Sequence, residues 1–493
     1  MGRSSSGQPG PPGAGRGGRK IAAGAGAGLL LAGILALAAN MRAAITSLPP
    51  LFPQLHSTLH LSTAGQAVLA AIPVLCFGVF SGSGAPLARR FGEERVLGAA
   101  LVTLAAGLLV RAAAPGALLF PGTIIAGGSI ALLNVLTPSL VKRRQPERAG
   151  LLIGLYLLSL SAGAVVASLI AVPVFQAAGG GAGAIRLTLG LWAVPALLAA
   201  ALWSPQLRFR TLPGFLARPV PETSAPPGAA ADPALAANPA LAGEPGLAGE
   251  PGLAAETGLA AEPGLAGEPG LAGDPGQAGA AATAAGATPV PQARRAPAAL
   301  RRSALAWQVT AFLGLQSLSY YATLSWFPTM FQDRGASAVH AGTLLAIMGL
   351  GNAVTALGVP ALAHRLPDQR RLAAIWMIVT AAGLAGSAFA PLGAAAAFML
   401  LLGLGQGASL GLGIFYTVAR APDPVTSASL SGFAQSIGYL LASTGPLLLG
   451  FLHTATGGWD IPVWVLLGVV ALQLVTGWLA GRARTVPPVA RAG

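Results

Sequence analysis

Charged residues are scarce in this sequence of 493 residues, at 9% of the chain, whereas hydrophobic residues make up 54%. Soluble globular domains carry about 25% charged side chains, because their surfaces face water. The shortage excludes an ordinary soluble domain and indicates a chain whose surface faces lipid.

Cysteine is nearly absent as well. Cys76 is the only cysteine, and a single cysteine excludes an intramolecular disulfide. The apolar runs also lack acidic residues and histidine, which fall at the ends of the runs or between them. This pattern argues against an enzyme, because no intramembrane acid, histidine or metal cluster is available for chemistry. We expect no catalytic residue, no bound metal and no cofactor.

The sequence is instead rich in apolar windows of about 20 residues, the length that crosses a hydrocarbon core about 30 Å thick. Backbone groups find no water in lipid, so each span is predicted to be an α-helix. We expect an all-α integral membrane fold with twelve transmembrane helices. The predicted spans are 24–48, 64–86, 96–114, 117–140, 150–175, 184–203, 304–329, 338–362, 372–390, 392–417, 427–450 and 461–480.

Basic residues predict the orientation of these spans, because Lys and Arg of short loops remain on the cytoplasmic side. With the N-terminus inside, 25 of the 29 Lys and Arg residues lie on that side, three lie outside, and Arg42 lies within a span. We expect a multi-pass protein of the inner (plasma) membrane with both termini cytoplasmic. This orientation accounts for the net charge of +14 without nucleic acid. The expected partners are a small-molecule substrate and the lipid bilayer, and the expected state is a monomer.

The chain repeats itself across a central low-complexity segment. Moving the second half back by 275 residues places Phe327 and Pro328 over Phe52 and Pro53, which predicts two six-helix pseudo-repeats. The segment contains units such as LAGEPG and 8 of the 15 acidic residues, and such sequence cannot bury enough apolar surface to fold. The predicted organisation is a disordered basic tail at 1–20, a six-helix half at 21–203, a disordered cytoplasmic linker at 204–302, a second six-helix half at 303–482 and a C-terminal tail at 483–493.

Four motifs carry a resemblance to a known family. They are NMRAAITSLPPLFPQL in the first predicted helix, GLQSLSYYATLSWFPTMFQDRG in the seventh, LLGLGQGASLGLG in the tenth and SLSGFAQSIGYLLASTGPLLLG in the eleventh. Together with the two six-helix halves, they resemble the cyanate and nitroimidazole transporter family (CynX/NimT) of major facilitators. The resemblance implies secondary transport by alternating access, with the substrate near the bilayer midplane between the halves. The chain departs from the wider superfamily at Arg89, which lies near the usual place of an aspartate in the loop between helices two and three.

Arg42 is the residue of the spans that most needs an explanation, because a charge near the bilayer centre costs about 2.5 to 3.5 kcal/mol on insertion scales. The spans offer no acidic partner, so we expect Arg42 to bind a small anion or a carboxylate-like group through its planar fork of donors. The alternative is that Arg42 extends to the outer end of its helix, since Pro49 and Pro50 follow within about two turns.

Polar residues at helical spacing complete the expected site. At about 100° per residue, Thr46 shares the stripe of Arg42, and Asn40 lies on another. The alternative for each polar stripe is helix packing, in which such hydrogen bonds are worth about 0.6 kcal/mol each. The candidate substrate-binding residues are Asn40, Arg42, Thr46, Asn134, Tyr156, Gln316, Tyr320, Tyr321 and Gln435, and the candidate cytoplasmic gate is Arg89, Arg90 and Arg365.

Three function classes remain open. Secondary transport of a small anion is the first, and efflux of small drugs such as nitroaromatics is the second, favoured by Tyr320, Tyr321, Trp326 and Phe433. The third is a membrane sensor that signals through the linker. Protons are an open partner, since the family resemblance implies a proton-linked mechanism, whereas the lack of an acidic relay in the spans leaves passive or exchange transport as the alternative.

Overall fold

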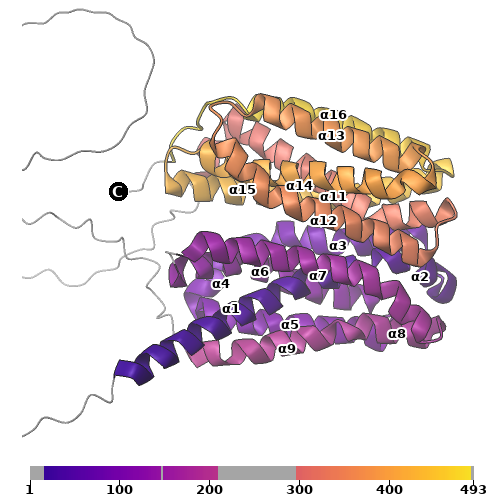
Figure 1. The fold of residues 1–493 in the computed structure, drawn as a ribbon, viewed down its shortest axis with the longest axis horizontal. Helices are drawn as coiled ribbons and strands as arrows, with labels where there is room; N and C mark the ends of the chain where they lie inside the picture. Colours follow the sequence, from indigo (N-terminus) through magenta and orange to yellow (C-terminus); the bar gives the residue numbers. More distant parts are fainter. Residues whose placement is uncertain (1–15, 146–147, 209–295, 490–493) are drawn as a thin grey trace, which may run out of the picture. The chain divides into compact units, whose positions relative to one another are not determined.

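The computed structural model describes residues 16–145, 148–208 and 296–489 (Figure 1). Every element in these ranges is a helix, which confirms the predicted all-α class. The helices of the first half are α1 (Arg16–Thr46), η1 (Pro49–Leu51), α2 (Phe52–Leu59), α3 (Thr63–Phe80), η2 (Ser81–Ser83), α4 (Gly84–Phe91), α5 (Glu93–Ala113), α6 (Leu119–Arg144), α7 (Ala149–Ala177), α8 (Gly181–Leu191), α9 (Ala193–Trp203) and η4 (Ser204–Arg208).

The second half repeats the pattern of long helices. Each of its six predicted spans overlaps one of them. Its helices are α10 (Ala296–Arg301), α11 (Ala304–Asp333), α12 (Ala338–His364), α13 (Arg370–Phe389), η7 (Leu392–Ala394), α14 (Ala395–Ala419), α15 (Pro424–Thr456) and α16 (Asp460–Ala480).

Eleven segments of the described residues are long and apolar enough to cross a membrane. The sequence predicts twelve. The predicted span that is missing from the eleven is 304–329, which corresponds to α11. Its 30 residues give it sufficient length, but polar side chains, Gln308, Gln316 and Ser319 among them, make it less apolar than the other long helices. The first half supplies six of the eleven segments, in which α1, η1 and α2 form one, and α8 and α9 form another.

The predicted N-terminal tail and the predicted linker are partly helical in the structure. Helix α1 begins at Arg16 and thus includes the last five residues of the predicted tail. The short helices η4 and α10 lie inside the predicted linker. The remaining residues of both segments, 1–15 and 209–295, lie outside the described residues.

Two prolines break the first transmembrane segment. Pro49 and Pro50 have no N–H group and cannot continue the hydrogen-bond pattern of α1, which ends at Thr46. The chain passes through the 3₁₀ turn η1 into α2. The break therefore lies about one turn beyond Arg42 and determines where the helix of this arginine ends.

Glycines allow α12 and α14 to pack backbone against backbone. A Cβ atom at Gly403 would lie 2.1 Å from the carbonyl oxygen of Met348, and one at Gly407 would lie 2.1 Å from that of Asn352. No side chain fits at such distances, so both positions require glycine. The LLGLGQGASLGLG segment is thus a helix-packing motif of α14.

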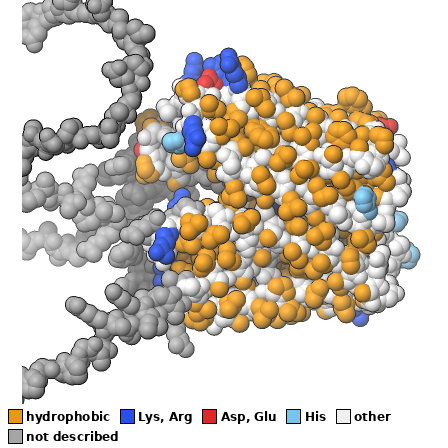
Figure 2. Space-filling view, viewed as in Figure 1, with side chains coloured by type: hydrophobic (Ala, Val, Ile, Leu, Met, Phe, Trp, Pro, Cys, Tyr) orange, Lys and Arg blue, Asp and Glu red, His pale blue; other side chains and the backbone are white. Residues whose placement is uncertain are grey.

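The two halves meet along two pairs of helices, α3 with α15 and α7 with α12 (Figure 1). At Gly78 of α3 the side chain of Leu440 approaches within 2.8 Å of the place of a Cβ atom, which indicates close packing. Figure 2 shows hydrophobic side chains over the visible flank of the helices, while most visible Lys and Arg side chains lie toward the left end of the view. An apolar flank with a basic end is the surface that a multi-pass membrane protein requires.

Candidate functional site

Arg42 lies on α1, about one turn before the helix ends, with its side chain half-buried. Its guanidinium carbon lies 5.1 Å from the ring centre of Tyr320 and 5.8 Å from that of Tyr321, both on α11 of the other half. Its Nη1 atom is buried and has no hydrogen-bond partner among the described residues. The negative faces of aromatic rings attract a cation, so the guanidinium is held by aromatic contacts across the two halves.

Two of the five tyrosines of the sequence thus contact this guanidinium. Besides Tyr320 and Tyr321, Tyr156 on α7 and Tyr439 on α15 lie within electrostatic range of Arg42. Tyrosines of both halves thus lie near this arginine.

Phe77 on α3 completes the aromatic wall of the site. Its ring centre lies 6.4 Å from that of Tyr321 and 5.5 Å from that of Tyr439. Phe77 and Tyr439 are absent from the predicted set. The available signal for Tyr439 was its spacing of four residues from Gln435, which places both side chains on one face of α15.

Asn134 of α6 belongs to the site through Tyr156. The Tyr156 hydroxyl donates a hydrogen bond of 3.1 Å to Oδ1 of Asn134. The donated proton leaves the lone pairs of the phenol oxygen free to accept. The structure therefore brings together five of the predicted substrate-binding residues: Arg42, Asn134, Tyr156, Tyr320 and Tyr321.

Two predicted residues of α1, Asn40 and Thr46, form side-chain hydrogen bonds with backbone carbonyls of α1 or of the neighbouring α7. The amide of Asn40 donates to the carbonyl of Ala36, and its Oδ1 is buried without a partner among the described residues. The Thr46 hydroxyl lies within hydrogen-bond distance of the carbonyls of Arg42, at 3.0 Å, and of Ala164 on α7, at 3.3 Å. The contact with Ala164 belongs to the interface between α1 and α7.

Two predicted glutamines differ in their surroundings. Gln316 is buried and donates to the carbonyl of Gln406 on α14, which ties α11 to α14. Gln435 is half-buried and donates to the hydroxyl of Ser431 on its own helix. It lies one turn from Tyr439, and hence on the face of α15 that reaches the tyrosine cluster.

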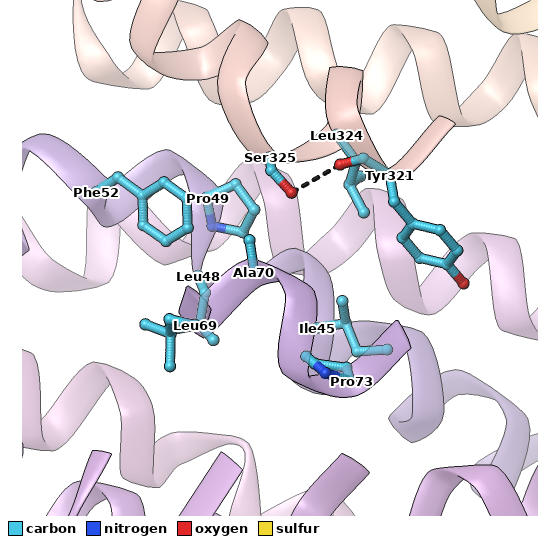
Figure 3. A pocket seen from close by; sticks show the side chains of 10 residues that line it. All are labelled: Ile45, Leu48, Pro49, Phe52, Leu69, Ala70, Pro73, Tyr321, Leu324 and Ser325. Carbon is cyan, nitrogen blue, oxygen red and sulfur yellow. Dashed lines mark hydrogen bonds between the residues drawn. The ribbon is translucent and has the colours of Figure 1, made fainter. Parts of the chain in front are cut away.

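A small pocket adjoins the cluster between α1, η1, α2, α3 and α11 (Figure 3). The space that it encloses takes about one water-sized sphere. Figure 3 shows Tyr321 at one end and the ring of Phe52 at the other, with Pro49 and Ala70 between them. Tyr321 therefore borders both this pocket and the guanidinium of Arg42.

The comparison with known proteins shows the family. The family model of the Major Facilitator Superfamily matches residues 29–443. The chain belongs to this superfamily. A relative, the 2-nitroimidazole transporter of Escherichia coli (strain K12), is 34% identical over 461 residues, which cover 93% of this chain and 96% of the relative. The cyanate transport protein CynX of the same strain is 26% identical over 440 residues, 89% of this chain and 93% of the relative. The chain is accordingly a major facilitator of the CynX/NimT type.

Solved structures support the fold of this major facilitator. The crystal structure of a D-xylose-proton symporter aligns with a TM-score of 0.61 at 16% identity and covers 93% of this chain and 98% of that chain. At this identity the likeness concerns the fold. Since the family and the relatives are transporters, the chain is a secondary transporter of a small solute and not an enzyme.

Three other buried or half-buried arginines of this major facilitator have backbone partners. Arg111 of α5 donates to the carbonyl of Ala44 at 2.9 Å. Arg334 donates to two carbonyls at the end of α13, and Arg420 donates to two carbonyls at the end of α16. Carbonyls at a helix C-terminus carry partial negative charge, so each arginine stabilises a helix end. Arg42 differs from all three, because no hydrogen bond from its guanidinium occurs within the described part of the chain.

Two acids at the start of α5 are buried, although the sequence places them beside a loop. Glu93 accepts from Arg143 at 2.5 Å and Glu94 accepts from Arg144 at 2.7 Å, so α5 and the end of α6 are joined by two ion pairs. The acids are only 3% and 2% exposed. Within the described ranges, no three His, Cys, Asp or Glu side chains lie close enough to hold a metal ion.

The predicted gate arginines are exposed. Arg89 and Arg90 lie in the last turn of α4, and Arg365 follows the end of α12. Arg90 lies over the ring of Phe91, at 5.2 Å from its centre. Their gating role stays a prediction.

Proposed function

We propose that this major facilitator carries a small anion or a carboxylate-like molecule and that Arg42 binds its charged group. The observation that carries the proposal is the guanidinium of Arg42, which lies against tyrosine rings and makes no hydrogen bond to another described residue. A guanidinium offers a planar fork of donors that matches a carboxylate. Tyrosine hydroxyls from both halves can supply further hydrogen bonds to the same anion.

The position of the site between the halves suits alternating access. Arg42 and Tyr156 belong to the first half, whereas Tyr320, Tyr321 and Tyr439 belong to the second. An anion bound here touches both halves, so its binding energy can favour the rearrangement that exposes the site to the other side.

We also propose that α11 is a twelfth transmembrane helix, although it is less apolar than the others. Its polar side chains Gln316 and Ser319 are buried against protein and not exposed to lipid, which lowers their cost in a membrane. Twelve spans keep the residues 204–302 and both termini on one side. The excess of Lys and Arg supports the assignment of that side to the cytoplasm of the inner membrane, with the protein as a monomer.

A second candidate is the transport of a neutral nitroaromatic compound. It is favoured by the likeness to a protein named 2-nitroimidazole transporter and by the aromatic walls of the site. Rings of a substrate could stack on Tyr320, Tyr321 and Phe77 without any need for a charge.

Thermal stabilisation of the purified full chain distinguishes the two candidates. A ligand that binds the folded state raises the unfolding temperature. Acetate, cyanate and 2-nitroimidazole are tested on the wild type, on Arg42→Gln and on Arg371→Gln, an equal loss of charge at an exposed position. We expect the anions to stabilise the wild type and Arg371→Gln but not Arg42→Gln. Stabilisation of all three proteins by 2-nitroimidazole alone would instead support the second candidate.

A further inference from the structure

We infer that the pocket between Tyr321 and Phe52 is an apolar subsite for a short hydrocarbon group of the anion held at Arg42. The inference rests on the proposed function and narrows its substrate class, from small anions in general to carboxylate-like anions with a small apolar part.

The first argument is the register of α1. Ile45, which lines the pocket, follows Arg42 by three residues within α1. Residues three apart lie on the same side of an α-helix. A ligand whose charged group meets Arg42 can therefore extend along this face into the pocket.

The second argument is a shared wall. The ring of Tyr321 lies 5.8 Å from the guanidinium carbon of Arg42 and also lines the pocket (Figure 3). A single side chain thus separates the polar and apolar regions. A ligand of a few carbon atoms is long enough to contact both regions, because both meet at this ring.

The third argument is the chemistry of the lining. Eight of the ten lining residues are apolar, and the other two are Tyr321 and Ser325. The Ser325 hydroxyl already donates to the carbonyl of Tyr321 at 2.7 Å. The pocket therefore holds water poorly, and an apolar group gains free energy by replacing it. The enclosed space, about one water-sized sphere, restricts that group to about the size of a methyl group.

The fourth argument is that both halves contribute walls. Pro49 and Ala70 come from the first half, and Leu324 comes from α11 of the second. The far end is closed by Phe52, whose ring centre lies 5.9 Å from that of Trp326. A group in the pocket therefore contacts both halves, next to the ring of Phe52 that closes the far end.

A series of carboxylates of equal charge tests the inference. Formate, acetate, propionate and butyrate are titrated against the purified full chain, and affinity is obtained from thermal stabilisation. Each methylene that enters the pocket should tighten binding about fourfold, until the pocket is filled. Binding of the whole series should be lost in Arg42→Gln.

Two variants change the size of the pocket in opposite directions. Ala70→Leu fills it and should remove the gain from formate to acetate while formate binds as in the wild type. Leu324→Ala enlarges it and should move the optimum to a longer chain. Ala64→Leu, an exposed position on the same helix, is the control and should leave the series unchanged.

The outcomes separate the inference from the proposed function. In one outcome the wild type binds all four carboxylates with equal affinity while Arg42→Gln binds none. This result overturns the subsite and leaves the anion site in place. A rising series that neither pocket variant alters overturns the assignment to this pocket. If no carboxylate stabilises the wild type, the proposed function fails together with the inference.

Discussion

Arg42 differs from Arg111, Arg334 and Arg420 in the bonding of its guanidinium. Arg420 also lies over a tyrosine ring, but it donates to backbone carbonyls. Arg42 lies against the rings of Tyr320 and Tyr321 and makes no hydrogen bond to another described residue. A cation–π contact keeps the guanidinium in place without using its N–H donors, which remain free for an anion. The residue is thus both anchored and available.

At the residue scale we predict that Arg42→Lys binds a carboxylate less tightly than the wild type but more tightly than Arg42→Gln. Lysine keeps the charge and loses the planar fork, and the loss of one charge-assisted hydrogen bond weakens binding about tenfold or more. Affinities from thermal stabilisation of the three proteins check the order. Equal affinity of the lysine variant and the wild type would show that only the charge is recognised.

At the scale of a helix, the broken end of α1 explains the burial of Arg111. Leu48 donates to Ile45, and Pro49 and Pro50 have no N–H, so the carbonyl of Ala44 receives its hydrogen bond from Arg111. Because Arg42 lies half a turn before Ala44, Arg111 fixes the segment that carries the proposed anion-binding residue. We therefore propose that Arg111 is a positioning residue.

We predict that Arg111→Met lowers both the unfolding temperature and the affinity for the anion, because it leaves a buried carbonyl unpaired at a cost of about 1 to 3 kcal/mol. Arg111→Lys should restore part of both, since lysine can still donate.

Arg334→Gln is the matched control for this prediction. Arg334 also stabilises a helix end, that of α13, which carries none of the site residues. We expect Arg334→Gln to lower the unfolding temperature and to leave the affinity unchanged. A loss of stability without a loss of affinity in Arg111→Met would contradict the positioning role.

At the scale of the whole molecule, contacts between the halves close the end beyond Pro49. Phe52 packs on Trp326, and the backbone of Gly342 on α12 approaches the carbonyl of Ser168 on α7. Alternating access requires these contacts to separate when the site opens at this end.

We predict that Trp326→Ala increases the exposure of the pocket to that side. Loss of aromatic pair energy of about 0.5 to 1.5 kcal/mol changes the population of the open form about twofold to tenfold. The measurement uses Ala70→Cys in a Cys76→Ser background and follows labelling by a membrane-impermeant maleimide from each side of sealed vesicles. Faster labelling from the side of Phe52 is expected, and an unchanged rate would show that this ring contact does not hold the closure.

Much of the fold was predictable from the sequence. In a membrane, the backbone N–H and C=O groups of a span must form hydrogen bonds within that same span. This requirement depends only on nearby residues. Windows of apolar residues identify the long helices, and the prolines after Thr46 identify the end of α1. The predicted span 304–329 identifies α11 as well, although polar side chains that are buried against other helices make this helix less apolar.

The sequence by itself determined the family, the helical class and the unusual status of Arg42, because each follows from residue order and composition. Only the tertiary structure decided the partners of the polar side chains. Helical spacing indicates that two residues share a face but not which helix that face meets. Gln316 thus bonds α14, whereas Tyr439, on α15, packs on Phe77 of α3. Partners depend on contacts between helices distant in sequence, and those contacts arise from the packing of the whole chain.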